Sequence, residues 1–133
     1  MLRLSRRAVL LIGFVIGLGL WLIPTLLLGV PVPWDGHGPA YPLALLAAGL
    51  LLGLLGPGRP GAAVAGVFLG QLLVLIWRVV TVPDARQLWL ITVMLLAGFT
   101  FVATGAGALL GSTLRRRLGP NGGSERRTFD RRT

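Results

Sequence analysis

Side chains that could perform acid–base or metal chemistry are rare in this chain. Its 133 residues include one histidine, four acidic residues and no cysteine, so disulfides and thiol nucleophiles are excluded. Asp35 and His37 lie two residues apart in a Gly- and Pro-rich segment, where they could titrate together or bind a metal ion. Two ligands are too few for a protein metal site, so we interpret this segment as a solvated turn. The sequence predicts no catalytic residue, no metal site and no cofactor.

Two polar side chains, Gln71 and Arg78, stand inside otherwise apolar sequence. Their spacing is close to two helical turns, so both should lie on one helix face. A buried amide in hydrocarbon is costly unless it is hydrogen bonded. The pair could line a polar pathway, or Gln71 could bond a neighbouring helix while Arg78 reaches the headgroups. We favour the second interpretation because Arg78 lies only five residues before Pro83, within reach of a membrane surface.

Four long apolar segments must position these side chains. They cover residues 8–30, 39–56, 61–82 and 87–114, and the only charged residue inside them is Arg78. A helix of roughly 20 apolar residues crosses a bilayer core about 30 Å thick. These segments are apolar on every side, unlike the helices of a soluble protein. We therefore predict an all-α, integral membrane four-helix bundle with short loops over residues 8–118, preceded by an N-terminal segment, residues 1–7.

The arginine positions predict an orientation for this bundle. All 13 basic residues are arginine, and ten of them lie in the two terminal segments. Because positive charge concentrates on the cytoplasmic side, both termini and the turn that carries Arg59 should be cytoplasmic. Trp34, Tyr41, Trp77 and Trp89 fall near the two opposite loops, where aromatic side chains favour the membrane interface. The charge pattern thus indicates a lipid bilayer partner and no nucleic acid.

Residues 119–133 form a separate basic segment. Their Gly-, Ser- and Arg-rich composition cannot bury an apolar core, so a disordered cytoplasmic tail is expected. Its arginines could associate with anionic lipid.

Each apolar segment contains two glycines four residues apart, which places both on one helix face. Small residues let helix backbones approach closely in a membrane, although some pairs would arise by chance among 20 glycines. Thr100 and Thr104 share the face of the last pair and are expected to bond carbonyl groups of their own helix. The predicted helix-packing residues are Gly13, Gly17, Gly49, Gly53, Gly66, Gly70, Gly107 and Gly111.

The glycine pairs also raise the question of an internal repeat. Residues 13–17 and 66–70 are similar in sequence, and each stretch lies in the first helix of a predicted hairpin of the same orientation. A duplication of one hairpin would explain the likeness. The similarity is short, however, and apolar segments resemble one another by default, which is the explanation that we favour.

The functional prediction follows from what the segments contain. No acidic residue lies inside them, whereas proton-coupled exporters built from four helices need an intramembrane carboxylate. The leading interpretation is a non-enzymatic structural or accessory protein, multi-pass in a bacterial cell (inner or plasma) membrane. It would pack against itself or a larger membrane protein. The alternative is a small transporter or channel subunit that works as a homo-oligomer, with Gln71 and Arg78 along the pathway.

Overall fold

All regular structure in the described residues is helical, which confirms that part of the prediction. The computed structural model describes residues 4–29, 32 and 38–119. The first helix begins after Ser5, whose hydroxyl oxygen accepts a hydrogen bond from the Ala8 N–H, and ends at Gly29 in the left-handed conformation. The elements in order are α1 (Arg6–Leu28), α2 (Ala40–Leu55), α3 (Pro60–Thr81), the 3-10 turn η1 (Pro83–Arg86), α4 (Trp89–Phe99), the π-helical turn η2 (Thr100–Thr104) and α5 (Gly105–Leu118).

Three helical stretches are long and apolar enough to cross a membrane. They are Arg6–Leu28, Pro60–Thr81 and Trp89–Leu118, with 23, 22 and 30 residues. The predicted segment 39–56 forms α2, which has only 16 residues. At 1.5 Å per residue α2 is about 24 Å long, shorter than the roughly 30 Å of a bilayer core. The fold is compatible with a membrane protein in which α2 is shorter than the three long helical stretches.

The last apolar segment forms a single helical rod with a change of hydrogen bonding in its middle. Between α4 and α5, residues Thr100–Thr104 adopt a π-helical turn. The rod continues to Leu118, four residues beyond the predicted apolar segment, because Arg115–Arg117 extend the last helical turns. The helical stretch thus begins two residues after the start of the predicted apolar segment 87–114 and ends four residues beyond it.

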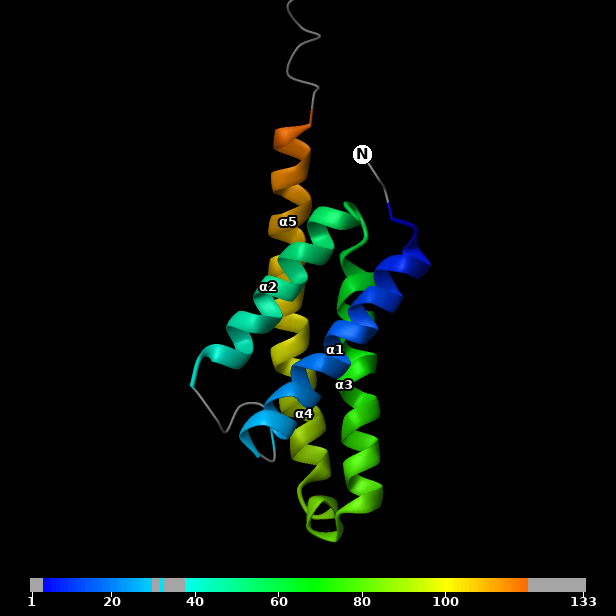
Figure 1. Cartoon of the computed structure of the whole chain (residues 1–133). Helices are drawn as coiled ribbons and strands as arrows, with labels where there is room; N and C mark the ends of the chain where they lie inside the picture. Colours follow the sequence, from blue (N-terminus) through cyan, green and yellow to red (C-terminus); the bar gives the residue numbers. More distant parts are fainter. Residues whose placement is uncertain (1–3, 30–31, 33–37, 120–133) are drawn as a thin grey trace, which may run out of the picture.

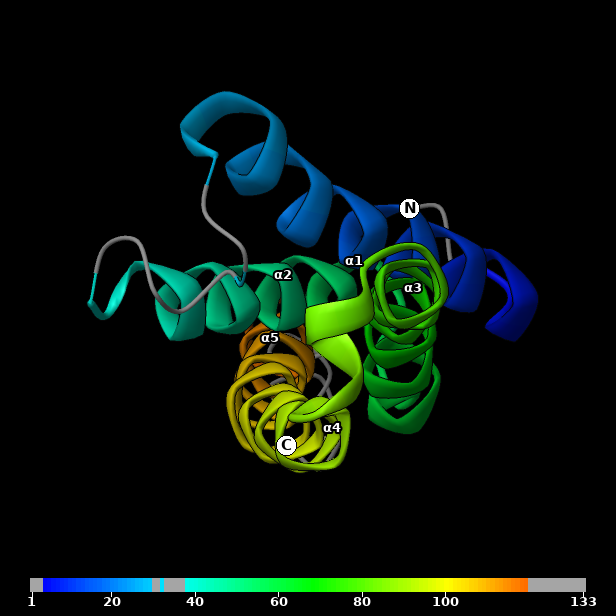
Figure 2. The ribbon, with the colours of Figure 1, turned by 90° about the horizontal axis from the view of Figure 1, so that it is seen from below.

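The helices pack in two pairs that are not neighbours in sequence. The most extensive contacts join α1 to α3 and α2 to α5, whereas α1 contacts α2 only sparsely. Figure 1 shows α1 crossing α3 obliquely and α2 crossing α5 in the same manner. Seen from below, α2 lies against the α4–α5 rod and α1 lies against α3 (Figure 2). The chain thus forms two hairpins, α1–α2 and α3–α5, that pack chiefly against each other.

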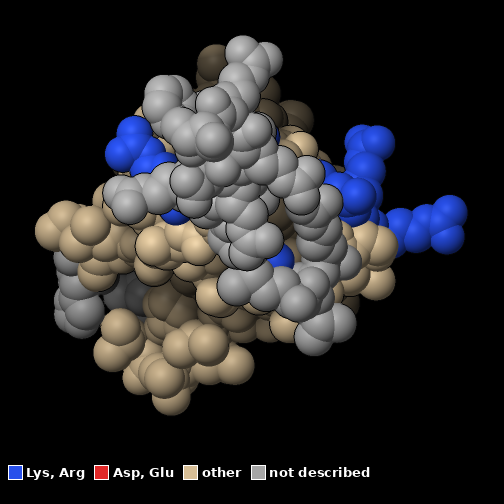
Figure 3. All heavy atoms as spheres, turned by 90° about the horizontal axis from the view of Figure 1, so that it is seen from above, with Lys and Arg blue, Asp and Glu red and all other residues tan. Residues whose placement is uncertain are grey.

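One end of the molecule gathers most of the described arginines. Arg59 donates a hydrogen bond from Nη1 to the carbonyl oxygen of Leu4, 3.1 Å away, and ties the 56–59 turn to the start of α1. Arg115 donates from Nη1 to the carbonyl oxygens of Leu54 and Leu55, at the end of α2. Viewed from this end, arginine side chains project at opposite edges (Figure 3). The arginines here are Arg6, Arg7, Arg59, Arg115, Arg116 and Arg117, while Arg78 and Arg86 lie toward the other end.

The aromatic residues divide between surface and interior. Trp77 and Trp89 are exposed on the outside of the helices, 68% and 47% respectively. Tyr41 was expected beside them, but it is buried, and its ring meets the edge of Phe99 with centroids 5.9 Å apart. The prediction of an interfacial Tyr41 is therefore wrong, because its hydroxyl finds a hydrogen-bonding partner between the helices. Trp34 lies outside the described residues.

Candidate functional site

The contact between α1 and α3 is made by backbone atoms at four glycines. A Cβ atom added to Gly17 would overlap the carbonyl oxygen of Val67, and its carbonyl carbon would be 3.0 Å away. No side chain larger than hydrogen fits there without moving a helix backbone. The contacts also advance together along both helices, which shows that α1 and α3 run parallel. Each glycine and the carbonyl oxygen that it faces are Gly13 with Ala63, Gly17 with Val67, Gly66 with Leu10, and Gly70 with Phe14.

The contact between α2 and the η2–α5 stretch repeats this arrangement. A Cβ atom on Gly107 would overlap the carbonyl oxygen of Leu46 and come within 2.8 Å of the Leu50 nitrogen. In both helix pairs every glycine faces the carbonyl oxygen of the residue three positions before a glycine of the partner. Each pair therefore has an approximate two-fold relation between parallel helices. The facing positions are Gly49 with Thr104, Gly53 with Ala108, Gly107 with Leu46, and Gly111 with Leu50.

Other glycines within the helices do not contact the backbone of a neighbouring helix in this way. A Cβ atom at Gly61 or Gly98 would meet nothing within 4 Å, and one at Gly19 would meet only a side-chain atom of its own helix at 3.6 Å. The structure thus separates the eight glycines singled out in the sequence from glycines that face open space.

A buried polar cluster joins three of the helical elements. The Gln71 side chain of α3 is fully buried, and its Oε1 atom accepts a hydrogen bond of 2.6 Å from the Tyr41 hydroxyl of α2. The Thr100 hydroxyl of η2 donates to the same oxygen at 3.3 Å. Trp21 of α1 is also fully buried and belongs to the same hydrophobic core as Tyr41. The amide oxygen of Gln71 therefore links α2, α3 and the fourth segment.

Two polar atoms of this region have no hydrogen-bond partner among the described residues. They are Nε2 of Gln71 and Oγ1 of Thr104, which is one helical turn beyond Thr100. Both side chains are fully buried. Buried polar atoms are nearly always paired, so unpaired ones call for a partner such as a water molecule. They lie on or against a π-helical turn, a feature that is frequent at functional sites.

The hydroxyl groups of the described threonines differ in their hydrogen bonds. Thr25, Thr81, Thr92 and Thr113 donate to carbonyl oxygens of their own helices. Thr100 was expected to do the same, but it donates to Gln71 of another helix. That expectation is wrong for Thr100, because a buried amide oxygen nearby is a better acceptor than a carbonyl already bonded within the helix. It is also wrong for Thr104, whose hydroxyl has no hydrogen-bond partner among the described residues.

Arg78 is placed apart from Gln71 in spite of their spacing on α3. Gln71 faces α2 and η2 in the interior, while Arg78 is only half-buried and lies near the C-terminal end of α3. Its Nη1 atom is buried and has no hydrogen-bond partner among the described residues. The carbonyl groups that end α3 are bonded by a different arginine, since Arg86 donates to Val79 and Val80. Among the described residues, no hydrogen bond joins Gln71 to Arg78, the two residues that the sequence placed on one face.

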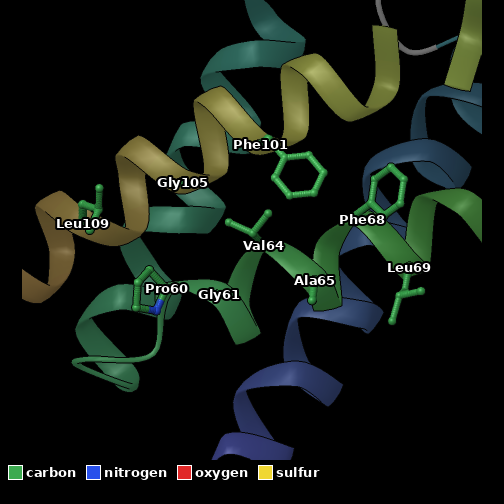
Figure 4. Close-up of a pocket in the computed structure, with 9 residues that line it drawn as sticks. All are labelled: Pro60, Gly61, Val64, Ala65, Phe68, Leu69, Phe101, Gly105 and Leu109. Atoms are coloured by element: carbon green, nitrogen blue, oxygen red, sulfur yellow. The ribbon is translucent and has the colours of Figure 1, made fainter. Parts of the chain in front are cut away.

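Two shallow apolar grooves lie on the outside of the helices. The first, about 380 Å³, runs between α3 and the η2–α5 stretch, and Figure 4 shows its lining residues. The rings of Phe68 and Phe101, with centroids 5.7 Å apart, lie at one end of it, and Leu109 lies at the other. The second groove, about 490 Å³, lies between the start of α2 and α4 and is lined by Pro42, Met94 and Phe99 among others. Neither is lined by a charged side chain.

The described residues contain no cluster of three or more His, Cys, Asp or Glu that could hold a metal ion. Asp35, His37 and the basic tail lie outside the described residues. Comparisons of the chain with protein-family models, with curated proteins and with solved structures give no match. Function must therefore be argued from the geometry of the glycine contacts and the polar cluster.

Sequence reasoning singled out Gln71 but missed the residues that bind it. Tyr41 was assigned to an interface and Thr100 to its own helix, yet both donate to the Gln71 oxygen. A signal was available: these are polar side chains inside apolar segments, and such groups must pair with one another where water is absent.

Proposed function

We propose that the chain is a non-enzymatic structural or accessory component of a bacterial cell membrane, with both termini in the cytoplasm. It would act by packing its helices against one another and against a further membrane protein or a second copy. The membrane location is supported by three long apolar helices. The orientation is supported by six arginines at one end of the molecule, since positive charge favours the cytoplasmic side.

The burial and hydrogen bonding of the Gln71 side chain favour a packing function over a transport function. Gln71 is the amide that a pathway through the helices would use, yet it is fully buried and its oxygen accepts hydrogen bonds from two other helical elements. An amide held in this way stabilises helix association in a membrane. The Oε1 atom, which accepts both interhelical bonds, is therefore not available to coordinate a passing solute.

The experiment that tests the proposal uses the absence of native cysteine. Single cysteines at 67, 71, 74, 75 and 78 would be treated from outside with a membrane-impermeant thiol reagent. We expect labelling at 78 and none at 71 or 67, because water does not reach the packed face. Leu73, which is exposed on the outer surface of α3, gives a matched cysteine that should remain unlabelled in lipid. Labelling that continues from 78 through 71 to 67 would refute the proposal.

A second candidate function is a small transporter or channel subunit that works as a homo-oligomer. The observation that favours it is the pair of buried atoms without partners, Nε2 of Gln71 and Oγ1 of Thr104, beside the π-helical turn. A solute that accepts or donates hydrogen bonds could occupy them. The same cysteine series decides between the two functions, since transport requires water along α3 down to position 71.

A further inference from the structure

The groove between α3 and the η2–α5 stretch has two different ends. Pro60 and Leu109 lie at the end that faces the arginines, and the rings of Phe68 and Phe101 lie at the other end (Figure 4). Leu109 follows Phe101 by eight residues, which is about 12 Å along a helix at 1.5 Å per residue. One leaflet contributes about 15 Å of hydrocarbon, half of a bilayer core. The groove therefore has the length of a lipid chain in one leaflet, and it is too short for a helix that crosses the bilayer.

The walls of the groove are apolar and partly open. All nine lining residues are apolar or glycine. A Cβ atom added at Gly61 would meet nothing within 4 Å, and one at Gly105 would meet only a side-chain atom of Val64 at 3.8 Å. An apolar chain can therefore lie between the two helices without displacing any side chain at these positions.

Arg116 continues the face of α5 that forms one wall of the groove. It follows Leu109 by seven residues, close to two helical turns, so both residues lie on the same face. The neighbouring Arg115 points to α2 and bonds its last carbonyl oxygens. Arg116 is exposed, and it takes no part in the hydrogen bonds and ion pairs of the described residues. Its guanidinium group is thus available to a ligand at the end of the groove.

The charge at this end of the molecule is not balanced within the chain. Six arginines gather here, whereas the one acidic residue in the described part of the chain, Asp84, lies in η1 at the other end. Residues 120–133 have four arginines and two acidic residues, so they add positive charge. The positive end of the α3 dipole also lies here, because α3 begins at Pro60 and no side chain caps it. This charge favours an anion from outside the chain.

We propose that the groove holds one acyl chain of an anionic phospholipid of the cytoplasmic leaflet, and that Arg116 binds its phosphate group. Guanidinium groups bind phosphate through paired N–H donors, and basic sites between membrane helices on the cytoplasmic side bind anionic headgroups. A partner helix would have to continue past the rings of Phe68 and Phe101, where the groove ends. The inference rests on the proposed membrane location and orientation, and it names a lipid as the partner of this surface.

The test of the headgroup contact measures lipid binding to the full chain in detergent micelles. Phosphatidylglycerol and phosphatidylcholine with identical acyl chains are titrated, and bound lipid is counted by native mass spectrometry. We expect tighter binding of phosphatidylglycerol. Arg116→Gln should reduce this preference about fivefold, equal to the about 1 kcal/mol of one basic side chain near anionic lipid. The matched control is Arg7→Gln, which removes an exposed arginine of the same end from α1 and should leave the preference unchanged.

The test of the acyl-chain contact fills the groove. Gly61→Leu places a side chain in open space within it and should weaken the binding of both lipids. Gly98→Leu fills the second groove, where the added Cβ atom also meets nothing within 4 Å, and should not weaken it.

Three results would each overturn the lipid site. They are equal affinity for the two lipids, equal effects of Arg116→Gln and Arg7→Gln, and unchanged lipid binding in Gly61→Leu. If Gly61→Leu reduces the size of an oligomer while lipid binding stays unchanged, a second copy covers the groove and the proposal is wrong. Lipid binding is measured in micelles and thiol labelling at position 71 in membranes, so failure of the lipid site and failure of the packing function are distinguishable.

Discussion

The replacement of Gly107 by alanine gives the most direct test of backbone-to-backbone packing. The new Cβ atom would overlap the carbonyl oxygen of Leu46 and come 2.8 Å from the nitrogen of Leu50, both backbone atoms of α2. Backbone atoms cannot rotate away as a flexible side chain can, so α2 and α5 must separate. The matched control is Gly98→Ala on the same helical rod, where the added atom meets nothing within 4 Å.

The expected magnitude follows from comparing the two variants. Both gain the helix propensity of alanine over glycine, up to about 1 kcal/mol, so this contribution cancels in the difference. The remaining steric cost of overpacking a close contact is about 1–3 kcal/mol. We therefore expect Gly107→Ala to be about 1–3 kcal/mol less stable than Gly98→Ala, and Gly98→Ala to be at least as stable as the natural protein.

The assay is reversible unfolding in mixed micelles, followed by helical circular dichroism and by tryptophan fluorescence. Trp21 is fully buried and lies in α1. In a background where the other three tryptophans are replaced by phenylalanine, its emission also reports whether α1 keeps its buried packing when α2 and α5 separate. If Gly107→Ala and Gly98→Ala unfold at the same denaturant concentration, the α2–α5 glycines do not form a close contact and the packing argument fails.

Three further predictions concern orientation, the polar cluster and the end of α2. Reporter fusions after residues 37, 59, 85 and 120 should be read as outside, inside, outside and inside, and a cytoplasmic signal at 37 would contradict the arginine argument. Tyr41→Phe removes the hydroxyl that donates to Gln71 and should lower the free energy of unfolding by about 0.6 kcal/mol and by no more than about 1.7 kcal/mol, the average and the maximum for hydrogen bonds between membrane helices. Thr92→Val, which removes a bond within one helix, should have a smaller effect on the same unfolding curve. Arg115→Gln should destabilise the protein by about 1 kcal/mol, because Arg115 donates to the last carbonyl oxygens of α2. Arg116 is exposed, and Arg116→Gln should not change the stability. Equal melting temperatures of the two variants would show that the Arg115 hydrogen bonds do not stabilise the end of α2.

The π-helical turn connects the glycine contacts to the polar cluster. Thr100 at its start donates to Gln71 of α3, and Thr104 at its end presents its carbonyl oxygen to Gly49 of α2. The two ends of one turn therefore serve two different helices. In an ordinary α-helix, residues four apart lie near one face of the helix. A π-helical turn contains more residues per turn, so it changes the angle about the helix axis between the Thr100 and Thr104 positions. The turn is thus part of how the fourth segment contacts both α2 and α3.

The amino-acid sequence determined the features that depend on composition and on helical period. Long runs of apolar residues indicated helices, and spacing by four placed Gly107 and Gly111 on one face regardless of what lies opposite. The arginines at the ends of the segments mark one end of the molecule, since charge does not enter an apolar layer. These properties belong to each segment alone, and they needed no knowledge of neighbours.

The tertiary structure decided which faces meet. Four segments with similar glycine pairs can associate in several ways, and no local signal distinguishes α1 with α3 from α1 with α2. The similar stretches 13–17 and 66–70 turned out to face one another across one contact. The burial of Tyr41 and the bond from Thr100 also depend on this pairing, because it brings both hydroxyls to the Gln71 oxygen. The pairing of the helices must allow two close backbone contacts and the hydrogen bonds of the buried Gln71 amide at the same time. This condition involves all the helices together, so it cannot be read from any single segment.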